Sequence, residues 1–124
     1  MHNMTPLMVR RDGRAVLALG SAGGVRIIDA VTQIIVNATV LGLPVEQAIS
    51  SPRIDMSGDA LLVDSRIPAR IQRELRSMGH HVVVAEESVG GHQFSRPALA
   101  AIDHRAGQIV AAVDPLRPGV AAGY

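Results

Sequence analysis

Residues 20–28 read Gly20-Ser21-Ala22-Gly23-Gly24-Val25-Arg26-Ile27-Ile28, so that a glycine pair separates an apolar run from an amphipathic helical pattern. Adjacent glycines accept φ > 0 and let the backbone approach another group closely. Such a backbone turns consecutive N–H groups toward one point, as in an anion nest or an oxyanion hole at the start of a helix. A tight strand-to-helix turn is the alternative, and the glycines by themselves favour it.

The composition fits one domain, or part of one, because 48% of the 124 residues are hydrophobic. All 12 basic residues are arginines spread along the sequence, and the formal net charge is only +1. With Phe94 and Tyr124 as its aromatic residues, the chain lacks the basic, aromatic surface typical of nucleic-acid-binding proteins. It has no cysteine, and its five histidines do not have zinc-ligand spacing, so we expect no disulfide, metal or other cofactor.

The hydrophobic runs of the sequence are short. None is long and apolar enough to span a bilayer, so the sequence predicts no membrane segment. The first residues do not have the charged-then-apolar order of a signal peptide. Any export signal would therefore lie outside this chain, and the sequence leaves the compartment open.

The first half of the chain predicts a hairpin followed by two helices. Apolar runs at 7–10 and 15–19 flank Asp12-Gly13, a strong signal for an antiparallel hairpin turn. After the glycine pair, apolar residues recur at helical spacing and predict a long, largely buried helix that ends at Gly42. Pro44 opens a short second helix through Ile49, and Ser51-Pro52 closes it. The expected core face of the long helix comprises Ile27, Ile28, Val31, Ile34, Ile35 and Ala38.

The second half predicts further strands around one helix. Short strands are expected at 53–55 and 61–64, a helix from Pro68 to its cap at Gly79, and a strand at 81–85. The helix has a basic outer face, and its core face is expected to comprise Ile71, Leu75 and Met78. A polar loop at 86–91 precedes a second hairpin, whose strands are 98–103 and 108–113. Antiparallel strand pairs with helices between them indicate an α+β arrangement.

Ordered landmarks along nearly the whole chain resemble one known family. They are Met4-Thr5-Pro6, the Asp12-Gly13 hairpin, the stretch 20–28, Ala48-Ile49-Ser50-Ser51-Pro52-Arg53, the junction 75–82, Asp114-Pro115-Leu116-Arg117 and Ala121-Ala122-Gly123-Tyr124. In this order they resemble the C-terminal part of the small subunit of γ-glutamyltranspeptidases.

The resemblance implies a fold that is part of an N-terminal-nucleophile hydrolase αββα sandwich, with antiparallel sheets and flanking helices. In that family a precursor cleaves itself and exposes a threonine, which attacks the γ-amide of a γ-glutamyl compound such as glutathione. The acyl group then passes to water or to an amino acid or peptide. Gly23 and Gly24 match the family's oxyanion-hole pair, in which two backbone N–H groups stabilise the tetrahedral oxyanion. Family members are often periplasmic or extracellular.

The resemblance also implies a substrate contact at His2 and Asn3. Many family members have two serines there, whose hydroxyls help to hold the α-carboxylate of the γ-glutamyl group. Asn3 can donate through its amide, and His2 can donate or, when protonated, supply charge. The substitution puts a preference for glutathione in question and fits a branch that acts on other γ-glutamyl or acyl amides. An ordinary chain end is the alternative interpretation of His2 and Asn3.

The family's nucleophile has no match in this sequence. Its threonine would precede His2, whereas Thr5, Thr32 and Thr39 are internal and have no free α-amine to act as a base. We therefore expect residues 1–124 to be a single partial domain, the C-terminal portion of a small subunit, and to be inactive alone. The expected partners are a γ-glutamyl small molecule, the missing N-terminal part of the small subunit and the large subunit. Exposed strand edges also predict self-association.

Two other functions fit the same residues. One is a stand-alone binding or scaffold domain whose glycine loop holds an anion at a helix N-terminus. The other is a fragment of a related acylase with a different amide substrate. A phosphate-binding P-loop is disfavoured because no lysine follows the glycines. His92 lies in 90–96, where the match is weakest, and we expect it to be a loop residue rather than a catalytic base.

Overall fold

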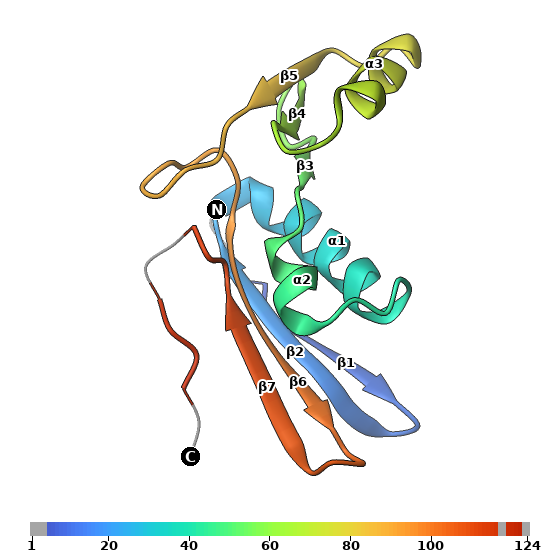
Figure 1. Ribbon diagram of the computed structural model, residues 1–124, viewed down its shortest axis with the longest axis vertical. Helices are drawn as coiled ribbons and strands as arrows, with labels where there is room; N and C mark the ends of the chain where they lie inside the picture. The colour runs from blue at the N-terminus through green and yellow to red at the C-terminus, as the bar shows by residue number, and fades with distance from the viewer. Residues whose placement is uncertain (1–4, 117–118, 123–124) are drawn as a thin grey trace.

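The computed structural model describes residues 5–116 and 119–122, which form a four-stranded and a three-stranded β-sheet with three α-helices (Figure 1). The chain turns from one sheet into the other and back again, so that the strands of the larger sheet come from both ends of the sequence. In chain order the elements are β1 (Leu7–Arg11), β2 (Arg14–Ala22), the short 3-10 helix η1 (Gly24–Arg26), α1 (Ile27–Thr39), α2 (Val45–Ser50), β3 (Ile54–Asp55), β4 (Leu61–Asp64), α3 (Ala69–Ser77), β5 (Val82–Ala85), β6 (Arg96–Asp103) and β7 (Gln108–Val113).

The larger sheet has the strand order β1-β2-β6-β7, and every neighbouring pair is antiparallel. Asp12 and Gly13 form the two-residue turn between β1 and β2, with φ values of 50° and 77°. A tight hairpin turn of this kind needs φ > 0 at both central residues, which Asp and Gly tolerate. Both predicted hairpins are thus confirmed, and the pairing of β2 with β6 joins them into one sheet.

One face of this sheet packs against α1 and α2 (Figure 1). Leu19 and Leu99 are paired across β2 and β6, and both are buried under α1. The predicted long helix is confirmed, but Ile28 was wrongly assigned to its core face, since 66% of that residue is exposed. Ile28 follows the buried Ile27 by a rotation of about 100° around the helix, which turns it away from the sheet.

The polar stripe of α1 holds the chain that leads from α2 into β3. The side-chain amide of Gln33 donates to the carbonyl of Ile54 at 2.8 Å and accepts from its N–H at 2.9 Å. One turn earlier, Asp29 accepts a hydrogen bond from the N–H of Met56 at 2.7 Å. These contacts satisfy backbone groups of a two-residue strand that has few sheet partners of its own.

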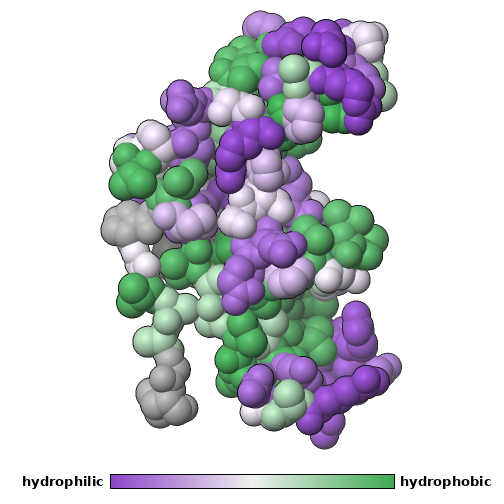
Figure 2. Space-filling model, in the orientation of Figure 1, coloured by the Kyte–Doolittle hydropathy of each residue, from purple (hydrophilic) through white to green (hydrophobic). Residues whose placement is uncertain are grey.

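The smaller sheet has the order β3-β4-β5 and differs from the sequence prediction in one respect. β4 and β5 are parallel, because α3 between them carries the chain back to the same end of the sheet. No residue of α3 is buried, and Met78, expected in the core, is 75% exposed. Leu75, near the C-terminal end of the helix, packs against the β4–β5 core, whereas Met78 lies just beyond the last residue of the helix. Figure 2 shows mostly hydrophilic residues over α3, at the top of the view.

A buried ion pair connects the segment that enters the smaller sheet with the segment that leaves the larger sheet. Arg53, just before β3, pairs with Asp114, just after β7, and both side chains are almost completely buried. Arg53 also donates to the carbonyl of Ile49 at 2.7 Å, and Asp114 accepts from the N–H of Leu116 at 3.0 Å. Since the burial of each charge is compensated mainly by the other, the pair fixes the end of α2 beside the end of β7.

We expect Asp114→Asn to lower the free energy of unfolding by about 3–5 kcal/mol, because it leaves the guanidinium of Arg53 buried without its counter-charge. Urea unfolding measures the loss. Glu74→Gln is the matched control, since it removes the exposed pair with Arg70 and should cost less than about 1 kcal/mol. Equal losses in the two variants would contradict a structural role for the buried pair.

A pH dependence is expected from Asp64 at the end of β4. Burial tends to raise the pKa of this carboxyl, but hydrogen bonds and the charge of Arg66 outweigh burial and hold the pKa below its ordinary value of 3.8. Asp64 therefore stabilises the fold above that value, and this contribution is lost as the pH falls through the folded-state pKa. In urea unfolding, the difference between the wild type and Asp64→Asn should be larger at about pH 6 than at about pH 3. A difference that is independent of pH would refute this assignment.

Candidate active site

The glycine pair lies where β2 leaves the larger sheet and the first helical turn begins. Gly23 has φ = 152° and Gly24 has φ = 63°, backbone conformations that residues with a Cβ atom rarely adopt. The carbonyl of Gly23 then accepts a hydrogen bond from the N–H of Arg26 at 3.3 Å, which closes the turn of η1 ahead of α1. Two glycines in succession thus convert an extended strand into a helix within a few residues.

Gly23 also passes very close to Ser95, the residue that precedes β6. A Cβ atom added to Gly23 would lie 2.7 Å from Cβ and 2.8 Å from Cα of Ser95. Ser95 is only 1% exposed, and its buried hydroxyl has no hydrogen-bond partner among the described residues. A side chain at position 23 would therefore displace either the glycine turn or the start of β6.

The N–H groups of Gly23 and Gly24 donate no hydrogen bond to any other residue in the described part of the chain. Gly23 is exposed and Gly24 is half-buried, so both N–H groups can be reached from outside the protein, and at the start of a helix such groups carry the partial positive charge of the helix dipole. Two such donors in sequence make a site suited to a small anion or to a developing oxyanion.

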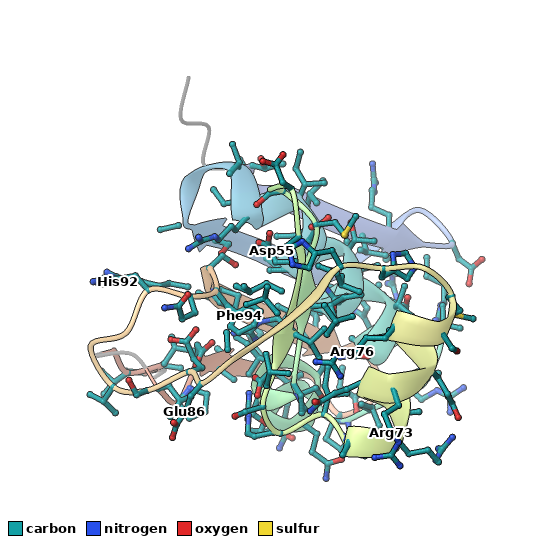
Figure 3. The ribbon with its side chains drawn as sticks, turned by 90° about the horizontal axis from the view of Figure 1, so that it is seen from above. Asp55, Arg73, Arg76, Glu86, His92 and Phe94 are labelled. Atoms are coloured by element: carbon teal, nitrogen blue, oxygen red, sulfur yellow. The ribbon has the colours of Figure 1, made fainter. Side chains whose placement is uncertain are left out.

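Two hollows border the glycine pair. The first, of about 340 Å³, lies between Gly23 and the start of β6 and is lined by Ala22, Gly23, Arg26, His92, Phe94 and Arg96. The second, of about 450 Å³, lies between the glycine pair and the loop after β3, where Asp55 and Ser57 contribute polar groups. Figure 3 shows His92 and Phe94 on the loop that leads into β6, and Asp55 on the separate strand β3.

Arg26 connects the walls of both hollows. Its Nε lies 3.9 Å from Oδ2 of Asp55, and its guanidinium donates to the carbonyl of His92. Asp55 is buried, and its Oδ1 accepts from the N–H of Ser57 at 2.8 Å. Its Oδ2 has no hydrogen-bond partner among the described residues, so the nearby positive charge of Arg26 is its main compensation.

A larger hollow, of about 930 Å³, lies at the opposite end of the larger sheet, between the hairpin turns and the start of α2. Its lining combines arginines and carboxylates with apolar residues, and it does not include the glycine pair. No group of three or more His, Asp or Glu residues in the described part of the chain is arranged to hold a metal ion. None of its helices is long and apolar enough to cross a membrane. The glycine turn, which places two unpaired N–H donors next to each other, is the candidate active site.

Comparison with known proteins shows the family of the chain. The family model described as gamma-glutamyltranspeptidase matches residues 1–124. The chain belongs to this family. A glutathione hydrolase proenzyme of Bacillus subtilis (strain 168) is 30% identical over 99% of this chain, which covers 20% of that relative. An acylase ACY 1 proenzyme of Pseudomonas sp. (strain SE83) is 33% identical over 72% of this chain and 16% of that relative.

The fold agrees with the family. A γ-glutamyltranspeptidase structure from Pseudomonas nitroreducens, complexed with L-DON, superposes on the whole chain with a TM-score of 0.82 at 24% identity, and the match covers 63% of that chain. The predicted α+β class and the N-terminal-nucleophile hydrolase fold are thereby confirmed. The chain spans only about a sixth to a fifth of the length of the curated relatives that it matches, and those relatives are proenzymes.

The residues predicted for a γ-glutamyltranspeptidase site have different outcomes. Gly23 and Gly24 lie together at the end of β2, with their N–H groups unpaired within the described chain. His2 and Asn3 lie outside the described residues. His92 is a loop residue, as predicted, and it lines a hollow beside Gly23.

Sequence reasoning did not single out Arg26, Asp55, Ser95 or Arg96 as neighbours of the glycine pair. Arg96 is far from Gly23 in the sequence, and the two come together because Ala22 pairs with Arg96 across β2 and β6. No local pattern indicates such a pairing, because register depends on which strands become neighbours.

We expect Gly23→Ala to lower the free energy of unfolding by about 2–4 kcal/mol. The new Cβ atom would collide with Ser95, and the positive φ would strain the backbone of an alanine. Gly79→Ala is the matched control: Gly79 has φ = 93°, but nothing lies within 4 Å of its added Cβ, so only the strain of roughly 1 kcal/mol applies. Urea unfolding of both variants separates the two contributions. Comparable losses would show that contact with Ser95 does not constrain position 23.

Proposed function

We propose that this chain is the C-terminal portion of the small subunit of a γ-glutamyltransferase or γ-glutamyl hydrolase, and that Gly23 and Gly24 form its oxyanion hole. The observation that carries the proposal is the pair of N–H groups that no described residue accepts, at the end of β2 in a member of this family. The proposed substrate is a γ-glutamyl amide such as glutathione, and the nucleophile is an N-terminal threonine from a preceding segment.

The proposed reaction explains why two donors are needed. Threonine Oγ forms a bond to the amide carbon, its proton moves to the free α-amine, and the carbonyl π electrons move onto oxygen. The N–H groups of Gly23 and Gly24 stabilise that oxyanion. When the carbonyl re-forms, the C–N bond breaks and the amine leaves with a proton. Water or a second amine then attacks the acyl-enzyme in the same way and releases the threonine.

The uncovered face of the larger sheet supports the proposal that further chain packs on it. Met8, Ala18, Ala100 and Ala111 form one row across the four strands, on the face opposite to the row that contains Leu19 and Leu99. Met8 is 62% exposed although it is apolar. An αββα sandwich places a second sheet against such a face, and the proposed partners, the rest of the small subunit and the large subunit, would supply it.

His2 and Asn3 are proposed to contact the α-carboxylate of the acyl group. The hydroxyl pair that many family members have at these positions is replaced by an imidazole and an amide, both of which can donate to a carboxylate. The change of donors supports a second candidate function, hydrolysis of an amide whose acyl group is not γ-glutamyl. Similarity to an acylase proenzyme supports the same alternative.

The main test is the activity of the complete open reading frame that encodes residues 1–124. We expect it to yield a processed enzyme that releases 4-nitroaniline from γ-glutamyl-4-nitroanilide. Gly24→Ala should lower kcat by roughly two powers of ten, because a displaced N–H no longer meets the oxyanion. Gly42→Ala is the matched control, since Gly42 has φ = 66° against 63° for Gly24 and lies beyond the far end of α1.

A processed protein without release, or equal loss of kcat in both variants, would contradict the γ-glutamyl proposal. Glutaryl-4-nitroanilide distinguishes the acylase alternative, because it differs from the first substrate only by lacking the α-amine. Faster release from the glutaryl compound would favour the acylase. An open reading frame without an upstream threonine-led segment, together with no activity on either anilide, would favour the stand-alone anion-binding domain.

A further inference from the structure

We propose that the hollow between Gly23 and the start of β6 is a carboxylate-binding subsite for the amine half of the substrate. Its cationic side chains are Arg26 and Arg96, so it is named here the Arg26–Arg96 pocket; His92 and Phe94 complete its wall. The assignment rests on the proposed function, because the amide carbonyl must lie at Gly23 and Gly24. Its ligand class is an amine or amino acid that carries a carboxylate, either as leaving group or as acyl acceptor.

The strand order is the basis for assigning one half of the substrate to this pocket. β1 lies on one side of β2, and β6 lies on the other. Positions 2 and 3, the proposed contacts of the acyl α-carboxylate, precede β1 in the chain, whereas Arg96 opens β6 opposite Ala22. With the acyl group assigned to residues that precede β1, we assign the amine half to the pocket beside β6, the neighbour of β2 on its other side.

The charges around the pocket leave one cation uncompensated. Arg26 lies beside the carboxylate of Asp55 at 3.9 Å, and Glu87, on the loop before β6, accepts from the N–H of Phe94 at 2.8 Å. Arg96 takes part in none of the ion pairs between described residues. A carboxylate beside Arg96 would gain a charge-assisted hydrogen bond without having to displace an internal partner carboxylate.

The pocket is also held in shape before any ligand enters. His92 accepts two hydrogen bonds, one from Arg26 to its backbone carbonyl and one from Arg96 to Nδ1 of its ring. Phe94, on the same loop, is buried. The loop is thereby tied to the start of α1 on one side and to β6 on the other, which lowers the entropy lost on binding.

The first experiment measures binding to the 124-residue chain and does not need the nucleophile. The probe is 5-amino-2-nitrobenzoate, and 4-nitroaniline is the comparison without a carboxylate. In ¹⁵N-resolved NMR titrations, the benzoate should shift the backbone amides of Gly23, His92 and Arg96, whereas 4-nitroaniline should not. Arg96→Gln should weaken benzoate binding by roughly fivefold. Arg73→Gln, on the exposed face of α3, is the matched control and should leave binding unchanged.

The second experiment measures the same preference in the complete enzyme. We compare kcat/KM for the anilides of 5-amino-2-nitrobenzoate and 4-nitroaniline, each with the same γ-glutamyl group. The ratio should fall roughly fivefold in Arg96→Gln and stay constant in Arg73→Gln. If the NMR spectrum of the isolated chain shows the poor dispersion of an unfolded protein, the kcat/KM ratio in the complete enzyme tests the proposal instead.

The results of the two experiments distinguish failure of the carboxylate subsite from failure of the proposed function. Shifts of the same amides by both probes, shifts elsewhere, or binding that is equally strong in Arg96→Gln would overturn the carboxylate subsite. Specific benzoate binding without any anilide hydrolysis would support a carboxylate site in this pocket, but would reject the proposed function and with it the role of the pocket in binding the amine half. Hydrolysis with an unchanged substrate ratio in Arg96→Gln would support the proposed function and reject the subsite.

Discussion

The close approach of Gly23 to Ser95 is the constraint on which the rest of this site depends. Because position 23 has no Cβ, β2 can run alongside the start of β6 and then turn directly into the first helical turn. The same turn frees two consecutive N–H groups and brings the loop before β6 beside α1. The path of β2, the two unpaired N–H groups and the position of the loop before β6 all depend on the absence of a Cβ atom at position 23.

Features determined by neighbours in the sequence were predictable. Asp12-Gly13 identifies its hairpin because few residues tolerate φ > 0, and Pro44 and Pro68 mark helix starts because proline suits the first turn. Gly23 and Gly24 were singled out for the same reason. The catalytic role proposed for them rests on the resemblance to a family, since glycines at a turn are common in proteins of every function.

Features determined by distant residues were not predictable. Met78 fits the helical pattern of a core face, but the helix ends at Ser77, and whether the next position is covered depends on which distant segments pack beside it. The parallel pairing of β4 with β5 and the ion pair between Arg53 and Asp114 likewise depend on contacts between separated segments. Arg96 belongs to the same class, because it reaches the glycine pair only through the register of β2 and β6.

The row of small side chains across the larger sheet determines how closely another layer of protein can pack on it. Ala18, Ala100 and Ala111 present only methyl groups on the uncovered face. A layer that packs there approaches the backbone more closely than it would over leucines, since packed interiors leave no voids to absorb a difference in size. The distance between the sheet and any group carried by that layer is thus set by side chains only one methyl group deep.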